Sequence, residues 1–296
     1  MSAREPRWAG IFYGAEEAPC RREIDDCVRQ AGSPTVSSSL LLGGIVPHAG
    51  WVYSGSVAAA VFSVLAPRRP ETVVLFGAVH RVIGQTAAVF DQGCWRTPLG
   101  DVEIDDELAA EVAEVNGLIV TDRQPHLEEH SIEVQVPFVR QLIPGARIVP
   151  IMVPPTQRAC DVGGAVAEAI RRLDRAAVVV GSTDLTHYGP RFSFTPHGAD
   201  EQGLQWAKEV NDRRMIDRIL GLESHQIVAE SVEHRNACGG GAIAATVAAC
   251  EKLGATDATL LRHTTSRETA GDSEATDAVG YAGIVFHTAI EPMNDS

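Results

Sequence analysis

Basic residues are scarce in this chain of 296 residues: 25 lysines and arginines stand against 39 aspartates and glutamates, for a formal net charge of −14. A protein that binds nucleic acid or an anionic membrane surface needs a positively charged face. The adjacent basic pairs at residues 68–69, 171–172 and 213–214 are short and scattered. The charge balance therefore argues against nucleic acid and membrane as partners.

Long apolar runs are missing as well. The longest apolar stretch, residues 57–66, is far shorter than the roughly 20 residues that a membrane-spanning helix needs. The first ten residues are polar and contain no apolar core of the kind found in a signal peptide. From these features we expect a soluble, cytoplasmic protein.

Cysteines are few and form no C-x-x-C pair. Six in a chain of this length are too sparse for a disulfide framework, so we expect free thiols in a reducing compartment. Cys238 lies in a glycine-rich segment, and the others are expected to be small buried residues in the core. Those others are Cys20, Cys27, Cys94, Cys160 and Cys250.

Short apolar runs alternate with helical patterns along the whole chain, and no composition break or repeat marks a linker. This order is typical of an α/β protein with a mostly parallel central sheet that helices flank on both faces. We expect a single domain over residues 1–296, with an acidic loop at 268–277. The expected strands are 40–46, 72–76, 87–90, 147–153, 176–180, 259–265 and 279–286, and the expected helices are 55–65, 105–115, 130–143, 162–173, 201–222 and 241–253.

Reactive side chains follow several of the expected strands. His48, His80, Asp184 and His187 come shortly after apolar runs, and the carboxyl ends of parallel strands are where such folds bind ligands. Cys238 precedes an alanine-rich helix, whose N-terminal dipole would favour a thiolate. One such residue alone is weak evidence, but five at the same predicted edge indicate a site.

A second group of polar residues lies at 128–133. His130 and Glu133 are three residues apart and share one face of a helix start, with Ser131 near a capping position. They either cap the helix or form part of the pocket, with Glu133 orienting His130. Glu128 and Glu129 are expected to lie in solvent.

The remaining histidines have little supporting context. His197 follows a turn near the Asp184 loop, and its role stays open. Structural roles are expected for His225, His234, His263 and His287.

Five segments of the chain resemble, in order, the signature segments of one known family. They are Pro-His-Ala-Gly-Trp-Val-Tyr-Ser-Gly at 47–55, Gly-Ala-Val-His at 77–80, Glu-His-Ser-Ile-Glu-Val-Gln-Val-Pro-Phe at 129–138, Ser-Thr-Asp-Leu-Thr-His-Tyr-Gly at 182–189 and Ala-Cys-Gly at 237–239. The family is the Memo family, called AmmeMemoRadiSam system protein B in many prokaryotes. The resemblance extends over a core of about residues 40 to 287, and the first, third and fourth segments are its most specific.

The resemblance implies a fold similar to that of the class III extradiol dioxygenases, whose non-haem iron lies beside a parallel sheet. Carried over by motif, it makes His48, His80 and Cys238 the ligands of one metal ion. A thiolate with two imidazoles is a softer set than the usual two histidines and one carboxylate, and it suits copper or zinc as well as iron. Iron is the first expectation for the cofactor, with copper or zinc as the alternatives.

The same resemblance implies further pocket residues. His187 would transfer a proton, Asp184 would orient it, and His130 would line the pocket. The implied activity is that of a dioxygenase-like oxidoreductase acting on a small molecule of unknown identity. Two local departures from the usual family pattern are Arg81, where a second histidine is common, and the glycines at 239–241.

Two other functions remain open. Cys238 can be the nucleophile of a hydrolase, with His187 or His80 as base and the following glycines as an oxyanion-binding turn. Alternatively the protein is a non-catalytic module that binds metal or a peptide, although the acidic balance argues against a phosphopeptide. The family name also implies radical-SAM and AMMECR-type partner proteins, and this chain has no cysteine triplet for an iron–sulfur cluster of its own.

Overall fold

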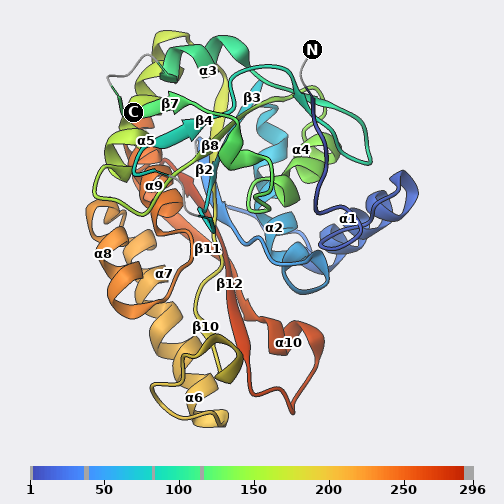
Figure 1. The fold of residues 1–296 in the computed structure, drawn as a ribbon, viewed down its shortest axis with the longest axis vertical. Coiled ribbons are helices and arrows are strands. Elements are labelled where there is room, and N and C mark those ends of the chain that lie inside the picture. Colours follow the sequence, from blue (N-terminus) through green and yellow to red (C-terminus); the bar gives the residue numbers. More distant parts are fainter. Residues whose placement is uncertain (1–2, 37–39, 82–83, 114–116, 290–296) are drawn as a thin grey trace, which may run out of the picture.

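The computed structural model describes residues 3–36, 40–81, 84–113 and 117–289. Within these ranges nine strands form one sheet, in the order β10-β12-β2-β9-β3-β8-β4-β7, with β11 also paired to β12 (Figure 1). The four central strands are parallel and buried, because they are almost continuously apolar and covered on both faces. They are β2 (Leu41–Val46), β9 (Ala177–Ser182), β3 (Thr72–Gly77) and β8 (Arg147–Met152).

The edges of the sheet add antiparallel pairs, so the sheet is parallel in its centre and mixed as a whole. β12 runs antiparallel to β2, and β4 runs antiparallel to β8. A small separate sheet holds β1, β5 and β6. The bounds are β12 (Ala278–His287), β11 (Asp257–Thr265), β10 (His187–Tyr188), β4 (Ala87–Val89), β7 (Ile119–Thr121), β1 (Ala3–Arg4), β5 (Cys94–Trp95) and β6 (Val102–Glu103).

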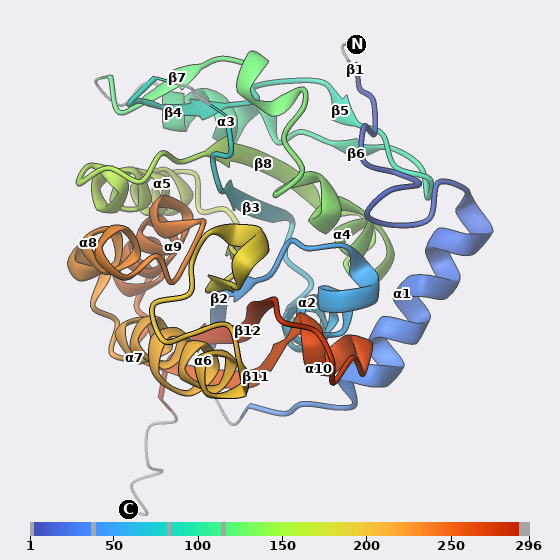
Figure 2. The same cartoon turned by 60° about the horizontal axis from the view of Figure 1, so that its bottom comes forward.

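Helices cover both faces of the sheet, as the alternating pattern predicts (Figure 2). One face carries α2 (Trp51–Leu65), with α1 (Glu17–Ala31) and α4 (Val136–Leu142) beside it. The other carries α9 (Gly240–Leu253) and α5 (Ala159–Arg172), flanked by α3 (Asp106–Ala113) and α8 (Ser224–His234). The single-turn 3-10 helices are η1 (Ala66–Arg68), η2 (Gln124–His126), η3 (Glu133–Gln135) and η4 (Pro190–Phe192).

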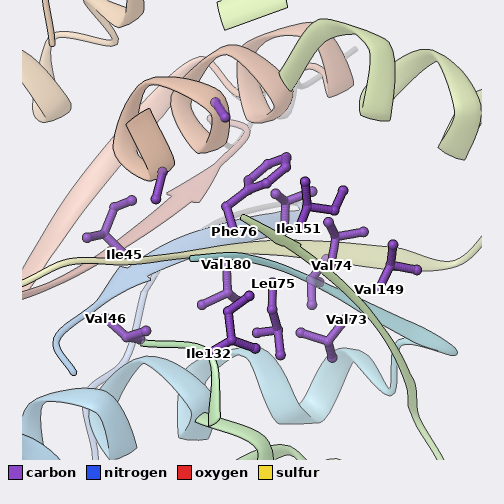
Figure 3. Close-up of a cluster of buried hydrophobic side chains, with 14 of the residues drawn as sticks. Ile45, Val46, Val73, Val74, Leu75, Phe76, Ile132, Val149, Ile151 and Val180 are labelled. Carbon is purple, nitrogen blue, oxygen red and sulfur yellow. The ribbon is translucent and has the colours of Figure 1, made fainter. Parts of the chain in front are cut away.

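The core lies on both sides of the central strands (Figure 3). Along β3, Val73 and Leu75 point toward α2, whereas Phe76 points with Ile151 toward the opposite helices. This alternation follows from the two-residue period of a strand. All four side chains are almost completely buried, so both faces of the sheet contribute to one apolar core.

Several expected elements differ from the observed ones. The helix expected at 201–222 is α6 (Glu201–Trp206), a π-helical segment (Ala207–Asp212) and α7 (Arg213–Leu220) in succession. The helix expected from residue 130 begins later, as η3 and then α4, with its proline in the first turn of α4. The first residues of the acidic loop expected at 268–277 belong instead to a short helix, α10 (Ser266–Ala270). Positions 114–115 of the expected helix 105–115 lie outside the described residues.

None of the described helices combines the length and the apolar character that crossing a membrane requires.

Candidate metal centre

The sheet order brings three loops of the chain to one edge. β9 lies between β2 and β3, and all three strands are parallel. Their carboxyl ends therefore meet, and the residues that follow them, His48, Asp184 and His80, lie at the same edge. This convergence is the one that the sequence predicts.

Three histidine rings form a cluster at this edge. The ring centroids are 5.0 Å apart for His48 and His80, 5.1 Å for His48 and His130, and 4.6 Å for His80 and His130. One ring nitrogen from each lies within 4.8 Å of the other two, which is close enough to hold a metal ion. His48 is buried and His130 is half-buried, whereas the His80 side chain keeps about a third of its surface exposed (33%).

Glu129 orients two of the three rings. Its Oε1 lies 3.0 Å from Nδ1 of His80 and 3.2 Å from Nδ1 of His130, and its Oε2 accepts the main-chain N–H of His80. Burial disfavours its charge, but His80, His130 and the N–H of Ser131 outweigh burial and hold the pKa of Glu129 at about 2. An ionised carboxylate beside both Nδ1 atoms fixes the orientation of the two rings and directs both Nε2 atoms away from Glu129.

Glu129 is therefore buried, and the expectation that it lies in solvent is wrong. The adjacent Glu128 does lie at the surface, where it pairs with Arg81. Two neighbouring acidic residues thus have opposite environments, and only the fold distinguishes them. Glu129 is the residue of the site that sequence reasoning missed, although its position next to His130 in the family-like segment was an available signal.

Glu133 has a different partner from the one expected. Its carboxylate accepts hydrogen bonds from Arg4 at 2.6 Å, from the main-chain N–H of Trp8 at 2.7 Å and from the Tyr13 hydroxyl at 3.0 Å. Because its side chain faces the N-terminal segment, the alternative in which Glu133 orients His130 is wrong. Ser131 does not cap a helix either, since its hydroxyl donates to the carbonyl of Ala78.

The N-terminal segment supplies aromatic neighbours to the cluster. The ring centroids of Trp8 and Phe12 lie 5.5 and 4.8 Å from that of His130. Burial, together with the charges of His80 and His187, lowers the pKa of His130 to about 4. His130 is thus a neutral ring at neutral pH, set between aromatic side chains and the other histidines.

His48 is fixed at three atoms. Its main-chain N–H donates to Asp184 Oδ1 at 2.7 Å, its Nδ1 lies 3.0 Å from the Ser182 hydroxyl, and its Nε2 lies 3.2 Å from Cys238 Sγ. Burial and the charges of the neighbouring histidines, His80 first, lower the pKa of His48 well below its usual value. Neutral imidazole is the form that ligates metals.

Cys238 lies just before α9, and its half-buried thiol accepts the main-chain N–H of Asp184 at 3.3 Å. The cluster of potential ligands among the described residues contains His130 rather than Cys238, so it does not match the expected set of His48, His80 and Cys238. Cys238 nevertheless contacts His48. The other five cysteines are free and buried, as expected.

His80 shows the combined influence of its neighbours. Burial opposes its charge, but hydrogen bonds and charges from Cys238 and Glu129 are stronger and raise the pKa of His80 to about 10. A metal ion that binds His80 therefore has to displace a proton.

Asp184 and His187 lie at the same edge but are not paired with each other. Asp184 bonds to the main chain of His48, and burial raises the pKa of Asp184 to about 7. Nδ1 of His187 lies 3.1 Å from the carbonyl oxygen of Leu185. The expected orientation of His187 by Asp184 is therefore absent among the described contacts. His187 is nevertheless close enough to both His48 and His130 to contribute to the lowering of their pKa values.

The glycines after Cys238 are explained by close packing. A Cβ on Gly239 would lie 2.6 Å from the carbonyl oxygen of Ser182, and one on Gly241 would lie 2.4 Å from that of Pro154. A larger side chain at Gly239 would push the start of α9 away from the end of β9, and one at Gly241 would push it away from the residues that follow β8.

Histidines outside the cluster have structural contacts. His197 stacks on Trp206, with ring centroids 4.1 Å apart. His263 bonds to Asp212 and His287 to Thr259, as expected for structural residues.

Comparison with known proteins identifies the family. The family model described as Memo-like protein matches residues 4–285. The chain is 39% identical over 290 residues to a MEMO1 family protein of Methanothermobacter thermautotrophicus, covering 94% of this chain and 98% of the relative. It is 39% identical over 295 residues to one of Methanopyrus kandleri, covering 96% and 98%.

A crystal structure of an uncharacterized protein from Escherichia coli K12 aligns with a TM-score of 0.49 at 12% sequence identity. The alignment covers 76% of this chain and 90% of that one. A likeness this weak adds nothing to the family assignment. The family match spans nearly the whole chain, including the N-terminal segment that contacts His130. It also contains every residue of the histidine cluster. The chain belongs to the Memo-like protein family.

Proposed function

We propose that this protein binds one metal ion between His48, His80 and Cys238, with His130 facing the same space. Iron is the first candidate, and copper or zinc are the alternatives. The observation that carries the proposal is the convergence of the three histidine rings, which each offer one nitrogen within 4.8 Å of the others. Cys238 adjoins this cluster, because its Sγ lies 3.2 Å from Nε2 of His48.

The donor groups fit a soft or borderline transition metal. Two imidazoles and a thiolate are the ligand types that iron, copper and zinc accept. The Nδ1 atoms of His48 and His80 are already engaged by Ser182 and Glu129, which directs Nε2 of each ring outward. A bound metal of this kind would supply Lewis acidity and, for iron or copper, redox chemistry.

The residues around the ligands support a dioxygenase-like oxidoreductase acting on a small molecule. A carbonyl oxygen only accepts hydrogen bonds, so Nδ1 of His187 donates to Leu185 and its Nε2 carries no proton. Burial lowers the pKa of His187, which keeps the ring neutral. His187 can therefore take a proton from a substrate, while Asp184 holds the main chain of His48 in place.

Metal analysis of protein purified without a chelating tag tests the proposal. We expect about one metal ion per chain in the wild type and a large loss in His48→Ala and in Cys238→Ala. The control His197→Ala, a histidine outside the cluster, should keep its metal. Undiminished stoichiometric metal in both His48→Ala and Cys238→Ala would refute the assignment.

A second candidate function has one observation in its favour. The 3.2 Å contact between Cys238 Sγ and His48 Nε2 has the geometry of a nucleophile and its base, with His48 in place of the expected His187 or His80. Against it, the N–H of Cys238 donates to Asp184 and that of Gly239 donates to Thr183, so neither is free to bind an oxyanion. Alkylation of Cys238 that metal does not slow would favour this function.

The proposal of partner proteins is based on family membership alone. Radical-SAM and AMMECR-type proteins are the candidates that we propose. A non-catalytic module that binds metal or peptide is the remaining alternative, and a metal-loaded protein without oxygen-dependent turnover would favour it.

A further inference from the structure

The hydroxyl of Ser182 sits among three polar groups behind His48. Its Oγ lies 2.7 Å from the main-chain oxygen of Ser131, 3.0 Å from Nδ1 of His48 and 3.3 Å from Nε2 of Gln135. Ser182, Ser131, His48 and Gln135 are all almost fully buried. Within the described structure these contacts form a closed network at the end of β9.

Counting protons in this network fixes their positions. Ser182 has one hydroxyl proton, and a carbonyl oxygen has none. Two oxygen atoms 2.7 Å apart repel each other unless a proton lies between them, so the Ser182 proton must point at Ser131. The hydroxyl then has only acceptor positions left for Gln135, whose amide donates, and for His48.

We propose that Ser182 is a positioning residue that fixes the tautomer of His48, with the proton on Nδ1 and none on Nε2. Nδ1 must be the donor in this contact, because the hydroxyl has no second proton to give. Nε2 consequently presents a lone pair toward Cys238. The functional meaning of this inference rests on the proposed function, because a metal ion at the proposed site would bind the unprotonated Nε2 of His48.

The arrangement also orients His48 toward Cys238. With the proton on Nδ1, Nε2 of His48 faces Cys238 Sγ at 3.2 Å with a lone pair. A metal ion at this place would have both atoms available as ligands. His48 differs here from His80 and His130, which a carboxylate orients: a neutral hydroxyl sets its tautomer without adding a charge.

NMR of metal-free protein labelled with ¹⁵N-histidine tests the tautomer directly. The two nitrogens of a neutral ring have widely separated shifts, and a His48→Gln variant assigns the signal among the ten histidines. We expect Nδ1 of His48 to be protonated in the wild type and a mixture of tautomers in Ser182→Ala. Ser182→Thr keeps a hydroxyl and should keep the wild-type pattern.

Metal affinity gives the second measurement, by competition with a chromophoric chelator for Zn²⁺. Loss of a hydrogen bond behind a ligating histidine weakens binding by about 10- to 100-fold, and we expect this for Ser182→Ala. Ser231→Ala is the matched control, because that hydroxyl is buried but bonds to a carbonyl of its own helix. It should change neither measurement.

The possible failures are distinguishable. A wild-type His48 with its proton on Nε2 would overturn the inference, whether or not metal binds. So would an unchanged tautomer in Ser182→Ala, because another group would then be fixing the ring. A wild-type protein that binds no metal would instead overturn the proposed function and leave the tautomer assignment standing.

Discussion

Glu128 and Glu129 show how the fold gives adjacent, chemically equivalent residues separate roles. The Glu128 side chain is 46% exposed and pairs with surface arginines, whereas that of Glu129 is 4% exposed and contacts two histidines of the candidate site. Charged residues are rarely buried unless they are paired, and Glu129 is paired. Its burial is therefore explained by its contacts with the two histidines of the candidate site.

We predict that Glu129→Gln weakens metal binding by about 10- to 100-fold, because the variant loses the charge that orients and polarises His80 and His130. Titration with Zn²⁺ against a chelating indicator measures the change. Glu128→Gln is the neighbouring control and should bind metal like the wild type. Equal affinity in the two variants would show that Glu129 has no part in the site.

The residues at strand ends were the easier ones to predict. His48, His80 and Asp184 follow apolar runs directly, so the strand pattern itself predicts their edge of the sheet. Glu129 and Ser182 act through other side chains, and no spacing rule indicates such contacts. His130 was found only through its segment, with the wrong carboxylate as its partner.

At the scale of elements, α5 and α9 pack unusually closely. A Cβ on Gly163 would lie 2.1 Å from the carbonyl oxygen of Ala245, so the two helix backbones approach there as only glycine permits. At the next residue, Gly164, the nearest atom would be Lys252 Nζ at 3.8 Å. The packing of α5 against α9 therefore requires glycine at position 163, whereas position 164 has room for a side chain.

We predict opposite effects of the same substitution at these two positions. Gly163→Ala should lower the free energy of unfolding by about 1–3 kcal/mol through overpacking between α5 and α9. Gly164→Ala should raise it by about 0.5–1 kcal/mol, because alanine favours the helix and has room there. Urea denaturation followed by circular dichroism measures both. A destabilised Gly164→Ala, or a neutral Gly163→Ala, would contradict the packing.

The elements that sequence reasoning missed share a cause. α1 buries only Cys20, Ile24 and Cys27, a narrow stripe in which cysteine replaces the usual large apolar residues. α8 buries Ile227 beside polar residues, so its pattern is not amphipathic. Hydrophobic periodicity predicts an element only where apolar residues make up its buried face. β2, β3 and β9 meet that condition fully and were predicted.

At the scale of the whole molecule, the N-terminal segment is joined to the site by a buried ion pair. Arg4 pairs with Glu133 at 2.6 Å, donates to the carbonyl oxygens of His126 and Glu129, and lies over the Trp95 ring. Both side chains of the pair are almost completely buried. A residue near the start of the chain thus supports the backbone that carries Glu129.

We predict that Arg4→Met lowers the free energy of unfolding by about 3–5 kcal/mol, because it leaves the Glu133 carboxylate buried without its cation. The exposed pair of Arg21 and Glu17 provides the control, and Arg21→Met should cost less than about 1 kcal/mol. Thermal and urea denaturation measure both. A loss in Arg4→Met no larger than that of the control would show that the ion pair does not stabilise the fold.

The sequence by itself determined the α/β class, the central strands and the edge at which His48, His80 and Asp184 gather, because apolar periodicity and the direction of parallel strands are local or topological properties. The tertiary structure decided which carboxylate lies behind the histidines, what Glu133 binds and how the hydroxyl of Ser182 is shared. Those contacts join residues 49, 129 and 134 positions apart, and hydrogen bonds between such distant side chains depend on angles and distances that only the packed chain defines.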